Sequence, residues 1–162
     1  MRRHPALREF SDDHHQGLVR ARRLRRAAAG EGEEPVEAAR AFVRFFREET
    51  EEHFEKEERV LLPVAEASGV SPREPDIRRM LAEHAELRRL VRRLEEEADA
   101  GNVRPETLRE AGGLLEGHIR LEERRVFPML ELELPERALD ELGRRVAEFG
   151  RSGGAQGGGS NP

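Results

Sequence analysis

The stretch EEHFEKEERVLLPV, residues 51–64, has a second version 65 residues further on, EGHIRLEERRVFPM, residues 116–129. In both copies a histidine is followed four residues later by Glu-Glu-Arg, and ten residues later by proline. Residues four apart lie one above the other on a helix face, so each copy predicts a helix that presents an imidazole beside a carboxylate. The repeat therefore indicates two equivalent helices.

The rest of the chain also has a helical pattern. Ala, Leu, Glu and Arg dominate, and strand-like alternation is missing. Start and stop signals predict helices at about 12–29, 35–62, 75–99, 105–127 and 136–149. Ser11 is the expected N-cap of the first helix, and Gly30 its expected end. Pro63 and Pro128 are expected to bend or stop the second and fourth helices.

Four long helices with short connections are typical of an all-α, up-down-up-down four-helix bundle. Residues 1–149 are expected to form this single domain, and the Gly/Ser-rich residues 150–162 a disordered tail. The short fifth helix is expected to pack on the bundle through Leu139, Leu142, Val146 and Phe149. The core is expected to include Phe42, Phe45 and Phe46.

Composition excludes several classes of function. The 162 residues carry a net charge of −5 and contain no cysteine, which rules out thiolate metal sites, iron–sulfur clusters and disulfides. No apolar run is long enough for a signal peptide or a membrane helix, so we expect a cytoplasmic protein with no membrane partner. The arginine-rich run at residues 20–26 lacks stacking aromatics around it, so we expect a solvated helix face and no nucleic-acid partner.

The spacing of histidine and glutamate is weak evidence alone, because glutamate is so common in this chain. However, His14 and His84 occupy matching places on the first and third helices. At about 1.5 Å rise per residue, His14, His53, His84 and His118 lie roughly 21–29 Å from the loops that join their helices. All four are therefore expected at one end of the bundle, within about one turn. A buried polar cluster of this kind is costly unless it holds something.

The sequence thus predicts a metal centre, and imidazole plus carboxylate on facing helices suits iron or manganese pairs. The expected ligands are His14, His53, Glu57, His84, His118 and Glu122. His14 is preferred to His15 because the positions at helical spacing from His14 are apolar, and His4 is expected to be a bystander. Acceptors for the second nitrogen of each ring are expected among Asp13, Glu49, Glu52 and Glu83.

With these residues, the chain resembles the hemerythrin-like HHE cation-binding family over about residues 7–132. The resemblance implies a left-handed four-helix bundle around two non-haem iron ions with a bridging oxo or hydroxo group. Manganese or a mixed pair is an alternative. It also implies that the four histidines are terminal ligands and that Glu57 and Glu122 bridge the two ions.

The sequence departs from the oxygen-carrying hemerythrins in two places. Arg88 stands where their third helix has a second histidine, and His118-x3-Glu122 stands where their fourth helix has His-x4-Asp. Two six-coordinate irons offer twelve positions, of which the implied ligands and the bridging oxygen fill ten. Two positions stay open unless His15, Glu123, another side chain or water fills one.

Two open positions suit ligand activation, peroxide chemistry or NO binding at least as well as reversible O2 carriage. We expect a protein that binds or senses O2, NO or peroxide, more than a dedicated enzyme, although the ligand set does not separate the two. A sensor would need a separate protein partner for its output. The alternative is a di-iron enzyme with peroxidase, catalase-like or ferroxidase activity in iron or oxidative-stress handling. The family's iron–sulfur repair branch carries an N-terminal cysteine segment, and the absence of cysteine removes the main support for that role.

Overall fold

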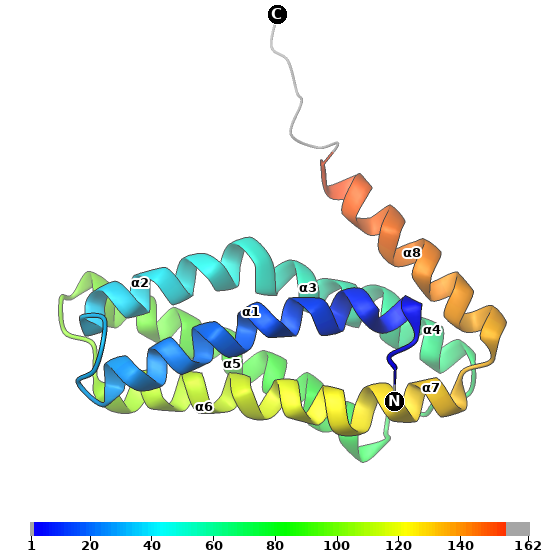
Figure 1. Ribbon diagram of the computed structural model, residues 1–162, viewed down its shortest axis with the longest axis horizontal. Helices are drawn as coiled ribbons and strands as arrows, with labels where there is room; N and C mark the ends of the chain where they lie inside the picture. Colours follow the sequence, from blue (N-terminus) through cyan, green and yellow to red (C-terminus); the bar gives the residue numbers. More distant parts are fainter. Residues whose placement is uncertain (1, 155–162) are drawn as a thin grey trace, which may run out of the picture.

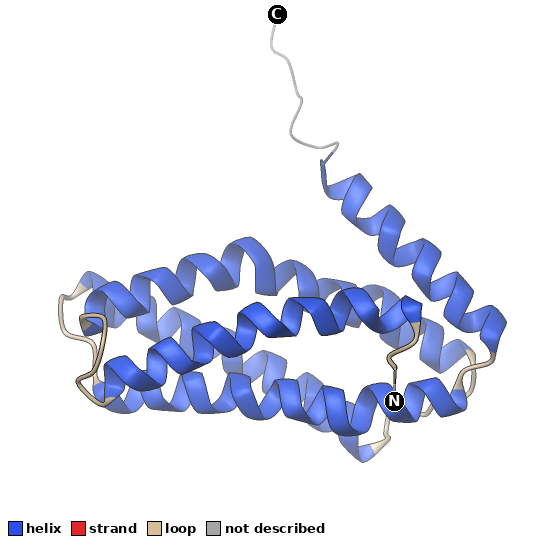
Figure 2. Cartoon of the chain, in the orientation of Figure 1, coloured by secondary structure: helices blue, strands red, loops and turns tan. Residues whose placement is uncertain are grey.

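The computed structural model describes residues 2–154, and all regular structure in that range is helical (Figure 2). Three single helices are α1 (Pro5–Ala28), α5 (Pro75–Asp99) and α8 (Glu136–Gly154). The second run joins α2 (Pro35–Phe45), η1 (Phe46–Thr50), α3 (Glu51–Lys56), η2 (Glu57–Leu61) and α4 (Leu62–Ala67). The fourth run joins α6 (Pro105–Leu121), η3 (Glu122–Val126) and α7 (Phe127–Glu133). The η segments are π-helical turns, which are wider than α-helical turns.

The four long runs lie side by side, and α8 leaves them at an angle (Figure 1). Helix α1 packs against α2 and α6, and α5 packs against the same two helices. Each run therefore neighbours the next one along the chain, and the last returns to the first, as in a helical bundle. Helix α8 contacts α1, α4 and η2, and these contacts lie at one end of the bundle (Figure 1).

The first helix begins earlier than expected. Helix α1 starts at Pro5 with His4 as its N-cap, so the expectation that Ser11 caps this helix is wrong. Leu7 and Phe10 are 0% and 1% exposed, and continuing the helix through them buries both side chains. Burial of two large apolar residues thus outweighs the local preference of serine for a cap position.

The C-terminal ends of α1 and α5 agree with the ends predicted from the sequence. Helix α1 stops just before Gly30, and α5 covers the predicted residues 75–99 and stops just before Gly101. Gly30 and Gly101 have φ values of 78° and 69°, in the left-handed region that glycine enters without a steric penalty.

Neither proline of the repeat ends its helix, so the expected helix ends at residues 62 and 127 are wrong. Pro63 and Pro128 each follow a π-helical turn, and these turns begin at Glu57 and Glu122. At the end of η2 the amide of Leu62 bonds to the carbonyl of Glu57, five residues back. A proline in a regular α-helix clashes with the carbonyl four residues before it, and the wider turn relieves that clash. The repeat therefore encodes a π turn as well as a pair of polar side chains.

The last helix extends five residues beyond its predicted end at residue 149, to Gly154. The rest of the predicted disordered tail lies outside the described residues. Leu139, Leu142 and Val146 of α8 are buried as expected, and Phe149 packs partly buried beside them.

Two apolar clusters fill the interior, one on each side of a polar layer. The first cluster includes Phe42 and Phe46, two of the three predicted core aromatics, together with Phe54, Leu87 and Ile119. The third predicted aromatic, Phe45, is also buried but lies outside this cluster. The second contains Leu7, Phe10, Leu61, Met80, Phe127 and the buried residues of α8. The polar layer thus lies inside the bundle. The expectation that it lies at one end is wrong, because the chain beyond it stays helical and packs.

The tight contact between α1 and α6 gives a prediction for stability. A Cβ atom at Gly112 would lie 2.8 Å from the carbonyl oxygen of Ala21, whereas one at Gly113 meets nothing within 4 Å. We expect Gly112→Ala to lower the free energy of unfolding by about 1–2 kcal/mol, because the clash exceeds the gain in helix propensity. Gly113→Ala is the matched control and should raise it by up to about 1 kcal/mol. Urea unfolding of both variants checks this, and equal effects would contradict it.

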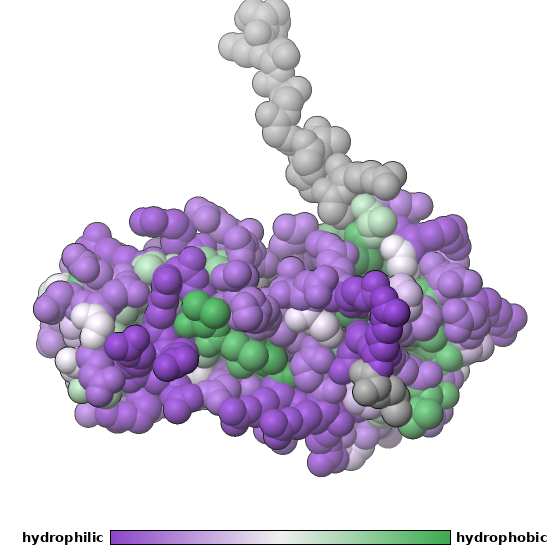
Figure 3. Space-filling model, in the orientation of Figure 1, coloured by the Kyte–Doolittle hydropathy of each residue, from purple (hydrophilic) through white to green (hydrophobic). Residues whose placement is uncertain are grey.

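The surface drawn in Figure 3 is mostly hydrophilic, with small separate apolar areas. Among the described helices, none combines the length and the apolar composition needed to cross a membrane.

Candidate metal centre

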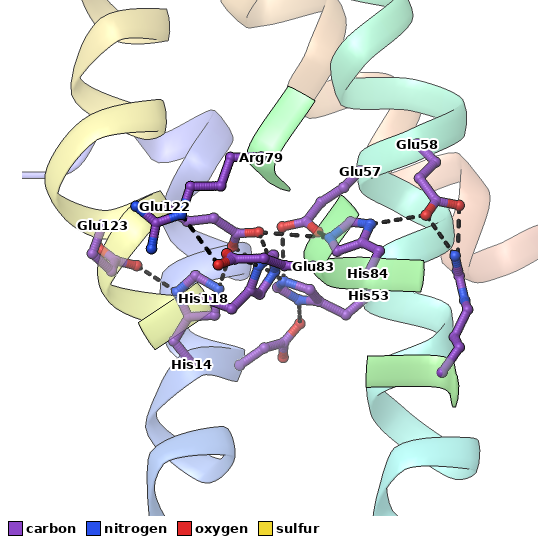
Figure 4. A network of polar contacts seen from close by, with 12 residues as sticks. His14, His53, Glu57, Glu58, Arg79, Glu83, His84, His118, Glu122 and Glu123 are labelled. Carbon is purple, nitrogen blue, oxygen red and sulfur yellow. Dashed lines mark hydrogen bonds and ion pairs between the residues drawn. The ribbon is translucent and has the colours of Figure 1, made fainter. Parts of the chain in front are cut away.

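The structure brings all six predicted site residues together in the polar layer between the two apolar clusters (Figure 4). They form two overlapping groups: His14, His53, Glu57 and Glu122, and Glu57, His84, His118 and Glu122. Within each group the nitrogen and oxygen atoms lie within 4.8 Å of one another. Both glutamates are 0% exposed, and the histidines are at most 6% exposed. Two equivalent clusters therefore share a pair of carboxylates.

Each shared glutamate divides its two oxygen atoms between the groups. The shortest separations are His53 Nε2–Glu57 Oε1 2.9 Å, His84 Nε2–Glu57 Oε2 3.0 Å, His14 Nε2–Glu122 Oε2 2.8 Å and His118 Nε2–Glu122 Oε1 2.7 Å. Neighbouring donors on a six-coordinate metal with bonds of about 2.1 Å lie about 3.0 Å apart. The separations therefore match the edges of two coordination polyhedra bridged by two carboxylates.

These atoms converge without hydrogen bonding to one another. The Nε2 atoms of all four rings and both oxygens of Glu57 and Glu122 are buried and have no hydrogen-bond partner of acceptable geometry. Burying eight such atoms unsatisfied is costly, and a protein retains them when they bind a ligand. The donor set of imidazole nitrogen and carboxylate oxygen suits iron, manganese or zinc, and the paired arrangement on facing helices suits two ions.

The second nitrogen of every ring donates to a carboxylate. The pairs are His14 Nδ1–Glu123 2.7 Å, His53 Nδ1–Asp13 2.9 Å, His84 Nδ1–Glu58 2.8 Å and His118 Nδ1–Glu83 3.2 Å. An ionised carboxylate can only accept, so Nδ1 carries a proton, and each ring presents a bare Nε2 to the cluster once it has lost its second proton. The acceptors thus fix the tautomer that a metal ligand needs.

Two of these acceptors were among the expected residues and two were not. Asp13 and Glu83 are confirmed, but Glu52 lies 3.5 Å from Lys56 Nζ and Glu49 contacts none of the four rings. The missed acceptors are Glu58 and Glu123, the second residue of each Glu-Glu doublet in the repeat. The first residue of a doublet faces the cluster, and the second accepts from the ring of a neighbouring helix. The doublet itself was the available signal.

Comparison with known proteins agrees with this geometry. The family model of hemerythrin, described as the hemerythrin HHE cation-binding domain, matches residues 6–130. The chain belongs to this family. No curated protein and no solved structure matches it. The matched range of the HHE domain contains all six residues of the cluster, their four carboxylate acceptors and the two π turns within the repeat.

Arginines hold three of the four acceptors of the HHE domain in place. The contacts are Arg88 Nη1–Glu58 2.7 Å, Arg79 Nε–Glu83 3.2 Å and Arg3 Nη2–Glu123 2.8 Å. Asp13 has no such partner within the described part of the chain. The hydrogen bond from His84, together with Arg88, lowers the pKa of Glu58 to about 2 although burial opposes this shift. Glu58 therefore stays ionised over the physiological pH range.

Arg88 occupies the position where oxygen carriers have a further histidine, and it points away from the cluster. Its guanidinium binds Glu58 and lies 2.6 Å from Glu51. The Phe54 ring stacks on His84 at 3.8 Å between centroids, and Arg88 lies over Phe54 at 5.5 Å. Arg88 therefore does not replace the missing histidine as a ligand. It contacts Glu58 and Phe54, the two residues that pack against or accept from His84.

The shared carboxylates also determine how the metal-free histidines titrate. Burial lowers the pKa of His84, but Glu122, Glu57 and Glu58 outweigh burial and raise it to about 10. The pKa of His118 is raised to about 9 in the same way, by Glu122 and Glu83 against the effect of burial. The pKa values of His14 and His53 are also raised. Without metal, His84 and His118 are therefore protonated at neutral pH.

This protonation predicts a pH-dependent affinity for metal. A ring must lose its Nε2 proton to bind a cation, so loading at pH 7.5 should release at least two protons per chain, from His84 and His118. Affinity should rise with pH up to about 9–10. Calorimetric titrations with Mn²⁺ in buffers of different ionisation enthalpy measure the release. A release below one proton per chain would contradict the prediction.

Proposed function

We propose that this HHE domain holds two non-haem iron ions and binds or senses O2, NO or peroxide at them. The observation that carries the proposal is the pair of four-donor groups that share Glu57 and Glu122. In the proposed centre each ion takes two terminal histidines, and both carboxylates bridge, together with an oxo or hydroxo group. Manganese or a mixed pair is the alternative content. Bound iron would supply redox chemistry and positions for a small ligand.

The identical ligand sets support an open position at each ion. Two histidines, two shared carboxylates and one bridging oxygen leave one of six positions free on each side. Arg88 is turned toward Glu58 and Glu51, and Glu123 is bonded to His14 Nδ1, so neither side chain completes a set. His15 is exposed and belongs to neither group. The proposal therefore differs from an oxygen carrier, in which a fifth histidine leaves a single open position.

The size of the cavity beside the cluster supports the proposal that the ligand is a small molecule. The cavity measures about 160 Å³ and is lined by His14, His53 and His118 together with apolar side chains such as Phe45, Leu115 and Ile119. Pockets for drug-sized molecules measure roughly 300–1,000 Å³. The cavity thus has room for a few water-sized molecules next to three ligand rings, but not for a large organic substrate.

The remaining parts of the proposal rest on the sequence and, for the handedness of the bundle, on the family. They are an up-down-up-down, left-handed bundle, a cytoplasmic location, and no membrane or nucleic-acid partner. A protein partner would be needed if the domain acts as a sensor.

Reconstitution tests the proposal. The full chain, loaded anaerobically with Fe²⁺, is expected to contain two irons and to bind two NO per chain in a spectroscopic titration. The chain contains no tryptophan or tyrosine, so the near-ultraviolet background is low and bands from iron should be resolved. Less than one iron or manganese per chain after reconstitution would overturn the di-metal proposal. Two irons without any response to NO, O2 or peroxide would overturn the ligand part alone.

The equal open positions also favour a second candidate, a di-iron enzyme that turns over hydrogen peroxide or oxidises ferrous iron. Peroxide consumption by the iron-loaded protein, compared with a Glu122→Gln variant, separates the candidates. Absence of turnover in the wild type rejects the peroxidase and catalase-like readings.

A further inference from the structure

The cavity beside the cluster connects two chemically different regions. At its inner side lie His14, His53 and His118, whose Nε2 atoms have no hydrogen-bond partner. At its outer side lie Asp12, Asp13 and Glu49, which are exposed. Apolar side chains of α2, α3 and α6 form the wall between them. The cavity therefore joins a carboxylate rim on the surface to the buried Nε2 atoms of three histidines in the interior.

The rim carries uncompensated negative charge. No arginine or lysine lines the cavity, although arginines bind many of the acids elsewhere on the chain. Asp12 and Glu49 make no ion pair within the described range. The cation beside this wall is Arg20, which lies over the Phe45 ring at 5.1 Å. Such a rim raises the local concentration of cations and repels anions, and it has little effect on neutral molecules.

The acidic rim is not a property of the whole surface. The groove between α1 and α6 is lined by Arg22, Arg25, Arg26, Arg109 and Arg120, with only two glutamates. A neutral ligand such as O2 or NO needs no carboxylates on its way in. The charge of the rim therefore fits a divalent cation.

The two groups of donors differ in access. His84 and His118 are 0% and 1% exposed, and Phe54 stacks on His84. His14 and His53 are each 6% exposed, and both line the cavity. Of the other group, only His118 lines the cavity. A cation that comes through the cavity thus meets both rings of the group of His14 and His53 but only one ring of the other group.

We propose that this cavity is the loading route of the metal centre, with Asp12 and Glu49 as the residues that capture a hydrated divalent cation. The captured ion passes to His14 and His53, so their group fills before the group of His84 and His118. Asp12 and Glu49 act on the rate of loading and are not ligands of the final centre. The inference rests on the proposed di-metal function.

The test is the rate at which metal-free full-length protein takes up Co²⁺, followed by its visible absorption after rapid mixing at low ionic strength. Asp12→Asn with Glu49→Gln should slow the second-order phase about three- to tenfold, and the difference should shrink as salt is added. The end point should stay at two ions per chain. Arg20→Gln should speed the same phase.

A matched double variant serves as the control. Glu48→Gln with Asp99→Asn removes the same charge from a different surface groove and should load at the wild-type rate. Loading of the Asp12 and Glu49 variant at the wild-type rate, or equal slowing of the control, overturns the proposed route while the end point still supports the metal centre. A wild-type end point below one ion overturns the di-metal function itself.

Discussion

Replacing Glu122 by glutamine is expected to remove both metal ions from the protein while its helices remain. Glu122 belongs to both donor groups, with one oxygen 2.8 Å from His14 Nε2 and the other 2.7 Å from His118 Nε2. A glutamine amide has nearly the same shape, but its NH2 group cannot bind a cation and it carries no charge. One substitution therefore removes a ligand from each ion and a bridge between them.

Metal analysis after reconstitution measures this effect, with circular dichroism to verify the helices. The wild type is expected to hold two ions per chain and Glu122→Gln close to none. Glu110→Gln, an exposed position on the same helix, is the charge-matched control and should hold two. Retention of both ions by Glu122→Gln would show that Glu122 does not bridge.

A terminal ligand should behave differently. His84 belongs to one group only, so His84→Gln should leave the group of His14 and His53 able to hold one ion. Binding of no ion by Glu122→Gln and of one ion by His84→Gln would distinguish a bridging carboxylate from a terminal imidazole. General damage to the fold would lower both values together.

The sequence predicted the composition of this cluster better than its surroundings. The interval of four residues between His53 and Glu57 places both on one helix face whatever the helix packs against, and the same holds for His118 and Glu122. Local geometry was therefore enough to pair each of these histidines with its glutamate, and the rise per residue placed His14 and His84 at the same level. The helix boundaries were harder to predict. Proline normally ends or kinks a regular α-helix, and the amino-acid composition does not reveal the π turns that accommodate Pro63 and Pro128.

That error had a consequence for the position of the site. If the helices ended near Pro63 and Pro128, the polar layer would lie at an end of the bundle, which is what the sequence predicts. In the structure the chain continues past both prolines, and α8 closes a second apolar cluster beyond the layer. The acceptors Glu58 and Glu123 were missed for a related reason. Each lies just outside the face that carries its preceding glutamate, and only the packing of neighbouring helices shows which ring it meets.

Loading the centre is expected to raise the thermal midpoint of unfolding by roughly 15–30 °C. The polar layer separates two apolar clusters, and without metal it holds buried donor atoms that have no hydrogen-bond partner. An ion that binds only the folded state at about a thousand times its Kd adds about 4 kcal/mol, so two ions add about 8 kcal/mol. In a domain of this size each kcal/mol moves the midpoint by about 2–4 °C. Calorimetry of stripped and loaded protein at pH 7.5 measures the shift.

The pH dependence of the stripped protein tests the same charges independently. The folded pKa values of His84 and His118, about 10 and 9, lie above the ordinary value of 6.5. Their contribution to stability is therefore complete below pH 6.5 and is lost as pH rises through 9–10. Metal replaces those protons, so the loaded protein should lose less stability over this window. Glu122→Gln should show no metal-dependent shift at any pH. A similar shift in that variant would mean that the ions stabilise the fold from somewhere other than this cluster.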